Sequence, residues 1–391
     1  MNVLSVISMQ ENASCVASNH VLVSGSDAYV HKLIFDEIKQ KMKGKKTILI
    51  NFDDTDDYTY ATLIRDGFST VNLLEVHGVF SNPFRDSRSL VGKSNIRSFA
   101  DCLGYDEPQK AKLIKYVEVM RQIANLKYGA NHLLLRDVRE LNSNHKFMKA
   151  LEMLKEEHVI SDDYMQDMLS RYLEVCDIAA DLENCFLTLD SIVAEDSGIF
   201  DELERGTVLL IPFSGLNQDR NLQEIILNLL WHSLKTSHDK SDYMLVVNEA
   251  GKCTGKALTK FLAILPSQMS KYVFTEDVFA LCSGSEYGIS NFLNKFDVHI
   301  YTRHNQMFSC AEVEKLAGEI KTIQRTYTKT HDYRLSANSW LDMLLDRDKV
   351  ESYTTPPPVW EKKFRQEEIA SFPKGSCLIS YNGIVSFYNL N

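Results

Sequence analysis

Two stretches decide the fold of this chain: His20-Val-Leu-Val-Ser-Gly25 near its start, and Tyr243-Met-Leu-Val-Val-Asn-Glu-Ala250 past its middle. Each is a short apolar, β-branched run ending in small or polar residues, which is typical of a strand buried on both faces. An amphipathic run with helical spacing, Leu33–Met42, follows the first stretch and stops at Gly44. A second apolar strand, Thr47–Phe52, comes next. Strand, helix and strand in this order make a βαβ unit, so we predict a parallel sheet.

The sequence pattern changes between residues 106 and 203, where no run typical of a strand is found. Apolar residues recur there every three or four positions, as in Leu113, Val117 and Met120. Breaks near residues 129–131, 142–144 and 161–162 divide this stretch into several helices. We therefore predict an α/β fold with an inserted all-helical domain. Its parts are residues 1–105 (first part of the core), 106–203 (helical insertion) and 204–391 (second part of the core with a C-terminal extension). Helices that pack only on one another are the alternative.

The remaining elements follow from the same patterns. Further strands are expected at Val71–Val76, Thr207–Phe213, Met244–Val247, Val278–Cys282 and His299–Thr302, and further helices at Leu222–Leu234, Phe261–Met269 and Ala311–Gly318. Residues 367–388 predict a short helix, a turn and terminal strands. Residues 320–355 are polar and aromatic and show no long core pattern.

Composition indicates an ordinary soluble protein, with 44% hydrophobic and 25% charged residues. No apolar run approaches the roughly 18 residues of a membrane span, and no secretory signal is evident. The eight cysteines are scattered and none forms Cys-x-x-Cys, which favours reduced thiols in a cytoplasmic protein. The histidines show no metal-binding spacing, so no metal site is expected. The formal net charge of −10 argues against sequence-independent binding of nucleic acid without excluding a local basic groove.

This order of elements resembles the HerA/FtsK-type P-loop ATPases, and most closely the cytosolic part of the TraG/TraD-type coupling proteins of conjugation and type IV secretion. The resemblance covers nearly the whole chain. Its landmarks are the two opening stretches at the Walker A and Walker B strands, together with segments 205–216, 296–303, 312–319 and 367–379. It implies a mainly parallel sheet of the RecA/FtsK-like type, a role in DNA transfer or secretion, and a place in the cytoplasm or at the cytosolic face of a membrane complex. Because the family's membrane anchor is absent, we expect either a naturally soluble member or an excised soluble part.

The residues at the Walker A position depart from the family pattern. A working phosphate loop reads Gly-x-x-x-x-Gly-Lys-Ser/Thr, where glycines turn backbone N–H groups onto the phosphates and the lysine supplies a cation. With Gly25 as the first glycine and Ser26 beside it, Val30 takes the second glycine position, His31 the lysine and Lys32 the hydroxyl. The nucleotide site is therefore expected to be vestigial.

The Walker B position departs too. Asn248 replaces the magnesium-side aspartate, and an amide lacks the charge that a hard dication prefers. Glu249 keeps the family's water-activating acid, and is catalytic only if the site works. Arg303 could serve by analogy as an inter-subunit arginine finger, although a structural arginine is the simpler reading.

We interpret the chain as a non-hydrolysing pseudo-ATPase that acts as a protein-interaction or substrate-recruitment module, with no cofactor expected. Its partners would be secretion or DNA-processing proteins, or a ring with itself or an active paralogue. Two alternatives stay open. One is an ATP-driven translocase of DNA or protein with ATP and Mg²⁺ in a divergent site, where Lys32 replaces the lost lysine. The other is a nucleotide sensor without turnover.

Overall fold

A computed structural model describes residues 19–53, 56–84, 90–129, 133, 135–179, 182, 191–194, 198–214, 220–236, 239–253, 257–282, 286–322, 326–331, 349–354, 359–381 and 384–390. The chain divides into two compact units. The first combines Met1–Thr302 with Lys374–Asn391, and the second is Arg303–Pro373.

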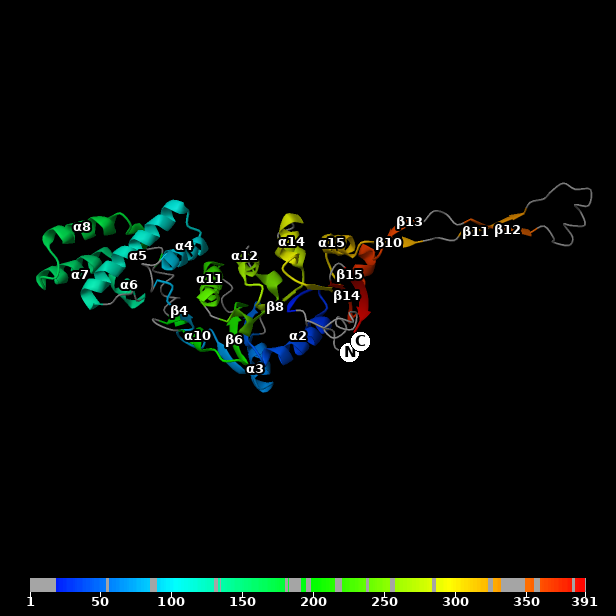
Figure 1. The fold of residues 1–391 in the computed structure, drawn as a ribbon, viewed down its shortest axis with the longest axis horizontal. Helices are drawn as coiled ribbons and strands as arrows, with labels where there is room; N and C mark the ends of the chain where they lie inside the picture. The colour runs from blue at the N-terminus through cyan, green and yellow to red at the C-terminus, as the bar shows by residue number, and fades with distance from the viewer. Residues whose placement is uncertain are drawn as a thin grey trace, which may run out of the picture. The chain divides into compact units, whose positions relative to one another are not determined.

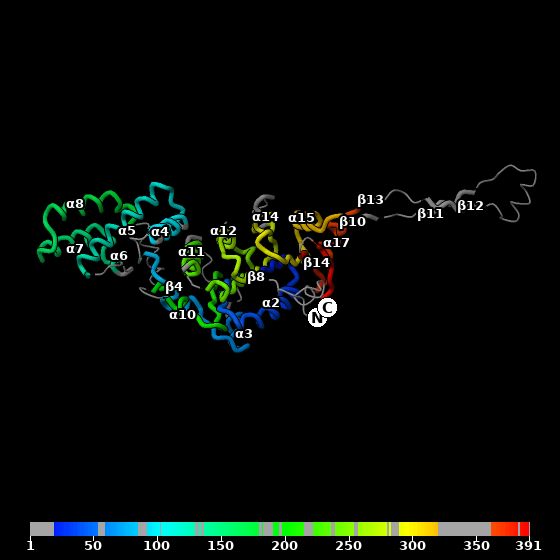
Figure 2. Tube along the Cα trace, viewed as in Figure 1, coloured from blue at the N-terminus to red at the C-terminus, as the bar shows by residue number. Residues whose placement is uncertain are grey.

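A nine-stranded sheet, counted over the described residues, forms the centre of the first unit, with strand order β15-β14-β9-β1-β8-β7-β2-β6-β3 (Figure 1). The strands are β1 (His20–Ser24), β2 (Lys46–Asn51), β3 (Ser69–Asn72), β6 (Thr207–Pro212), β7 (Tyr243–Asn248), β8 (Ser270–Thr275), β9 (Val298–Tyr301), β14 (Ser376–Tyr381) and β15 (Ile384–Asn389). From β9 to β3 all neighbours are parallel, whereas β14 is antiparallel to β9 and to β15. The N-terminal strand β1 (blue in Figure 2) and the C-terminal strand β14 (red) are therefore close in the sheet, with only β9 between them.

Alternating apolar residues bury both faces of this sheet. Helix α2 (Ala28–Met42) packs on one face through Val30, Ile34, Ile38 and Met42, each fully buried. It meets every second residue of the strands, such as Val21 and Val23, Met244 and Val246, and Tyr272 and Phe274. Helix α3 (Asp56–Arg65) lies on the same side, while α11 (Arg220–Thr236), α12 (Ala257–Ile264) and α14 (Glu286–Leu293) lie on the other (Figure 1). This unit also contains the short helices η2 (Lys240–Asp242), η3 (Ala250–Lys252) and α13 (Val278–Leu281).

A run of helices lies between β3 and β6. It consists of α4 (Leu90–Cys102), α5 (Glu107–Tyr128), α6 (Leu135–Leu141), α7 (Asn144–Glu156), α8 (Asp162–Leu173) and the short α10 (Ile199–Glu202). Ring stacking joins two of them, because Phe147 of α7 lies 4.0 Å from Tyr172 of α8 between ring centroids. The strands β4 (Phe80–Ser81) and β5 (Val193–Ala194) pair in parallel, one before and one after helices α4 to α8. We call α5 to α8 the helical body.

The second unit contains α15 (Met307–Ala317), α17 (Gln366–Ala370) and two antiparallel strand pairs. The pairs are β10 (Glu319–Thr322) with β13 (Val359–Lys362), and β11 (Thr326–His331) with β12 (Lys349–Thr354). Gly318 ends α15 with a φ of 76°, and its carbonyl accepts a hydrogen bond from the Lys363 amide at 3.0 Å.

The predicted α/β class with a mainly parallel sheet is confirmed. The segments Val21–Ser24, Ile48–Phe52, Val208–Ile211 and Met244–Val247 supply strands of this one sheet. The strand predicted at Val278–Cys282 is wrong, because this segment holds helix α13, and the preceding strand β8 was not predicted. Two other elements are displaced: the strand expected at Val71–Val76 ends at Asn72, and the helix expected at Phe261–Met269 ends at Ile264. The domain boundaries at 105/106 and 203/204 stay a prediction. No helix within the described ranges is both long and apolar enough to cross a membrane.

Candidate functional site

A turn of three residues, Gly25 to Asp27, connects the end of β1 to the start of α2. Gly25 has a φ of 127°, in the region that favours glycine, and its amide donates to the Thr275 carbonyl at 3.0 Å. The Ser24 hydroxyl accepts a hydrogen bond from the Val278 amide at 3.2 Å. The turn predicted to be the Walker A loop is thus tied directly to the end of β8 and the start of α13.

The Asp27 carboxylate caps the N-terminus of α2. Its Oδ1 accepts hydrogen bonds from the amides of Tyr29 at 3.0 Å and Val30 at 3.4 Å. Its Oδ2 accepts a third from the amide of Gly375 at 2.7 Å, although 348 residues separate the two in sequence. The Asp27 amide donates to the Thr302 hydroxyl at 3.3 Å, and the residue is only 8% exposed. A helix N-terminus attracts anions, and here the chain itself supplies the anion.

The next three residues of the predicted loop are helical. Ala28, Tyr29 and Val30 already belong to α2, so only Ser26 and Asp27 lie outside the helix between the two glycine positions. Val30 is fully buried against the sheet. The His31 ring packs on Phe274 with centroids 5.8 Å apart, while Lys32 is exposed to solvent. The helix begins this early because Asp27 is a strong N-cap residue.

The strands β2 and β7 end in paired amides. Asn51 and Asn248 face each other in register, and the Asn248 Nδ2 donates to the Asn51 Oδ1 at 2.8 Å. Asn51 is fully buried. The side-chain amide of Asn248 is therefore directed to the neighbouring strand β2.

Glu249 follows in a left-handed backbone conformation, with φ 54° and ψ 44°. This conformation is unfavourable for a side chain of this size and marks a position that the surrounding structure enforces. Burial raises the pKa of the Glu249 carboxyl, and the nearby charges of Glu276 and Asp53 raise it further, against a lowering by Lys252. Lys252 pairs with Asp53 at 2.7 Å between Nζ and Oδ1.

The structure brings the predicted residues to one edge of the sheet without joining them into one cluster. Gly25 and Ser26 follow β1, whereas Asn248 ends β7 and Glu249 follows it, and β8 lies between these strands. Thr275 at the end of β8 is bound by Gly25. Arg303 is exposed and begins the second unit. Among the described residues, no group of three or more His, Cys, Asp or Glu side chains is arranged to hold a metal ion.

Sequence reasoning missed Asp27, Asn51 and Gly375. Asp27 did carry a local signal, since an aspartate directly before an amphipathic run is a typical N-cap. No pattern in the sequence signals the partnership of Asp27 with Gly375.

No family model and no curated protein matches this sequence. Solved structures do match. The bacterial conjugative coupling protein TrwBdeltaN70, in a trigonal form in complex with sulphate, aligns with a TM-score of 0.56 over 95% of this chain and 85% of its own. VirB4 of Thermoanaerobacter pseudethanolicus aligns with a TM-score of 0.51 over 95% of this chain and 88% of its own. The chain has the fold of the conjugative coupling proteins. Sequence identity is 11% in both comparisons, so the likeness concerns the fold alone.

The two strand ends described above are the positions that the sequence predicts as Walker A and Walker B. The sequence predicts the phosphate loop at the turn after β1 and the Walker B residues at the end of β7. On this fold, the first position holds the Asp27 cap and the second holds the Asn51–Asn248 pair.

Proposed function

We propose that the chain is a non-hydrolysing relative of the coupling proteins of conjugation and type IV secretion, and that it recruits proteins rather than turning over ATP. The Asp27 carboxylate carries this proposal. It occupies the N-terminus of α2, where a P-loop ATPase would receive phosphate, and holds the amides of Tyr29, Val30 and Gly375.

A bound phosphate would meet two obstacles at this helix end. The amide N–H groups of Tyr29 and Val30 already donate to Asp27. The phosphate would also place a second negative charge beside the carboxylate. Two like charges about 4 Å apart repel by about 1 kcal/mol in water and about 4 kcal/mol near a protein surface. Both effects disfavour nucleotide relative to the cap.

The residues at the predicted Mg²⁺ position do not suit this ion. Mg²⁺ is bound by carboxylates, phosphates and water in near-ideal octahedral geometry. Asn248 is neutral and donates to Asn51, and Lys32 stands where the phosphate-loop pattern has its Ser or Thr. The translocase alternative needs Lys32 as the replacement cation, but this side chain lies on the exposed side of α2. A Mg-nucleotide therefore does not fit the residues at this edge of the sheet.

If the chain does not turn over ATP, we expect it to act by binding other proteins. The net charge of −10 disfavours binding that draws its affinity from neutralising DNA phosphates. We propose secretion or DNA-processing proteins as partners, with the helical body as the recognition surface. The chain would assemble in a ring with itself or with an active paralogue, and only the ring with a paralogue would place it beside ATP-hydrolysing subunits.

Titration calorimetry with Mg-ATP tests the proposal, accompanied by an ATPase assay with and without DNA. We expect no saturable binding up to about 1 mM nucleotide and no turnover above background. The matched control is Glu249→Gln, which should change neither measurement. Micromolar binding of Mg-ATP, or turnover that this substitution abolishes, would overturn the pseudo-ATPase proposal and favour the translocase.

A further inference from the structure

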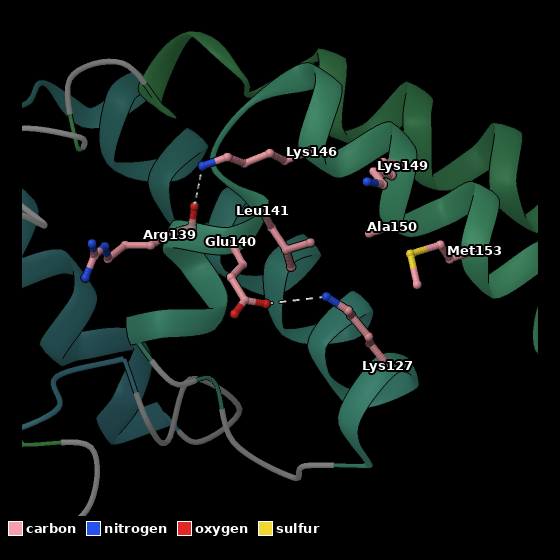
Figure 3. A pocket seen from close by; sticks show the side chains of 8 residues that line it. All are labelled: Lys127, Arg139, Glu140, Leu141, Lys146, Lys149, Ala150 and Met153. Atoms are coloured by element: carbon pink, nitrogen blue, oxygen red, sulfur yellow. Dashed lines mark hydrogen bonds and ion pairs between the residues drawn. The ribbon is translucent and has the colours of Figure 1, made fainter.

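A basic pocket opens on the helical body where α5, α6 and α7 meet. Figure 3 shows its lining side chains: Lys127 at the end of α5, Arg139, Glu140 and Leu141 on α6, and Lys146, Lys149, Ala150 and Met153 on α7. The cavity volume is about 580 Å³. This is within the range of roughly 300–1,000 Å³ that is usual for ligand pockets.

Positive charge dominates the lining. Four cationic side chains and one carboxylate line the pocket, in a chain whose net charge is −10. That carboxylate, Glu140, is already engaged by Lys127, at 3.4 Å between Oε2 and Nζ, and by the Tyr128 hydroxyl. The pocket therefore keeps a local excess of positive charge.

The two lysines of α7 are available to a ligand. Lys146 and Lys149 are three residues apart and thus lie on the same face of the helix. Lys146 donates only a long hydrogen bond, 3.4 Å, to the Arg139 carbonyl, and for Lys149 the described part of the chain provides no hydrogen bond or ion pair. Like charges at this spacing destabilise a helix by about 0.2–0.5 kcal/mol, so the pair is not explained by stability.

Apolar surface lies beside these charges. Leu141 and Ala150 are buried at the pocket, whereas Met153 is 43% exposed. A methionine side chain is flexible and polarisable, so it adapts to apolar groups of different shape. The lining thus combines cations that recognise carboxylates with a surface that accepts an apolar side chain.

These features favour a peptide over a nucleic acid. Single-stranded nucleic acids bind in grooves where cations follow the backbone and aromatic side chains stack on the bases. The eight lining residues include no aromatic side chain, and their cations gather around one hollow. Carboxylates next to an apolar residue match the arrangement more closely.

We propose that this pocket binds an acidic peptide segment of a protein partner, with carboxylates at Lys146 and Lys149 and an apolar side chain on Met153. The proposal rests on the recruitment function proposed above and names the chemistry that the helical body recognises. Because the charges are exposed, the affinity falls as salt is added.

Fluorescence anisotropy with labelled peptides tests it on the full chain. The probe is a 12-residue peptide of alternating glutamate and leucine, compared with the same peptide carrying glutamine and with an oligothymidylate of 12 nucleotides. We expect the glutamate peptide to bind saturably below about 1 mM, and at least about tenfold more tightly than the other two probes. This comparison needs no variant.

Charge reversal then locates the site. Lys146→Glu with Lys149→Glu should weaken binding of the glutamate peptide at least about tenfold. The control is Lys112→Glu with Lys115→Glu, which makes the same change at the same spacing on α5 outside the pocket, at lysines that pair with Asp177 and Glu174. It should keep the affinity within about twofold. Met153→Ala should weaken binding by a smaller factor, about threefold.

Four outcomes would overturn the pocket: no saturable peptide binding, equal binding of the glutamine peptide, equal losses in both charge-reversal variants, or tighter binding of the oligonucleotide that the pocket variant abolishes. Titration of Mg-ATP into the same preparation separates the two proposals. If the peptide does not bind and Mg-ATP does not bind either, only the pocket proposal is overturned. If the chain hydrolyses ATP and the peptide still binds, only the pseudo-ATPase proposal is overturned.

Discussion

Replacing Asp27 by alanine removes three hydrogen bonds at once. The Asp27 carboxylate accepts them from the amides of Tyr29, Val30 and Gly375. Loss of an N-cap aspartate costs about 1 kcal/mol, within a range of roughly 0.5–2 kcal/mol. The Gly375 amide is buried and would lose its acceptor, which adds about 1–3 kcal/mol. We expect Asp27→Ala to lower the free energy of unfolding by about 3 kcal/mol in total.

The assay is urea unfolding followed by tryptophan fluorescence and circular dichroism, with the slope held in common between variants. Asp106→Ala is the matched control, because Asp106 caps α5 by accepting from the Gln109 amide at 2.9 Å and is exposed. It should cost only about 1 kcal/mol. Asp27→Asn keeps an oxygen for the helix cap and should fall between the two.

Amide hydrogen exchange identifies the remote contact directly. In the Asp27→Ala variant, the Gly375 amide should exchange faster than in the unmodified chain. Equal losses of stability for Asp27→Ala and Asp106→Ala, with Gly375 protection unchanged, would refute the idea that Asp27 joins the start of α2 to the C-terminal strands.

Three further substitutions test other parts of the structure. Glu249→Gln should stabilise the chain at neutral pH, because the raised pKa means that folding disfavours the charged carboxylate. This gain should vanish in urea titrations below about pH 4, where the carboxyl is protonated in both states. Gly198→Ala should destabilise by about 3 kcal/mol in thermal or urea unfolding, because its Cβ would collide with the Val79 carbonyl group. Tyr172→Ala should cost about 3–5 kcal/mol by the same measurement, since it removes a buried ring stacked on Phe147.

The sequence predicted those strands whose apolar runs end in recognisable turns. Met244–Val247 and Val21–Ser24 are examples, and the helix breaks near residues 129–131 and 161–162 agree with the end of α5 and the start of α8. Strand β8 was missed because it opens with Ser270-Lys271 after a helical pattern. The short apolar run Val278–Cys282 was assigned to a strand because periodicity cannot distinguish a short buried helix from a strand.

The candidate site was predicted in position but not in detail. Gly25 and Asn248 could be placed at strand ends from their neighbours alone. Aligning Val30, His31 and Lys32 to a phosphate loop located the residues, but not the early helix start at Asp27 that places them within α2. The bond from Gly375 depends on how the C-terminal strands pair with β9, and such long-range pairing leaves no trace in local patterns.

The position of β1 has a consequence for the order in which the chain folds during synthesis. This strand is completed at Ser24, yet its neighbours in the sheet are β8 and β9, which begin at Ser270 and Val298. At about 5–20 residues per second, a ribosome needs roughly 10–50 s to supply the first of these partners. Throughout that interval both edges of an apolar strand stay unpaired, a state prone to aggregation. We therefore expect β1 to be the part of the nascent chain most in need of protection from aggregation until its C-terminal partner strands are made.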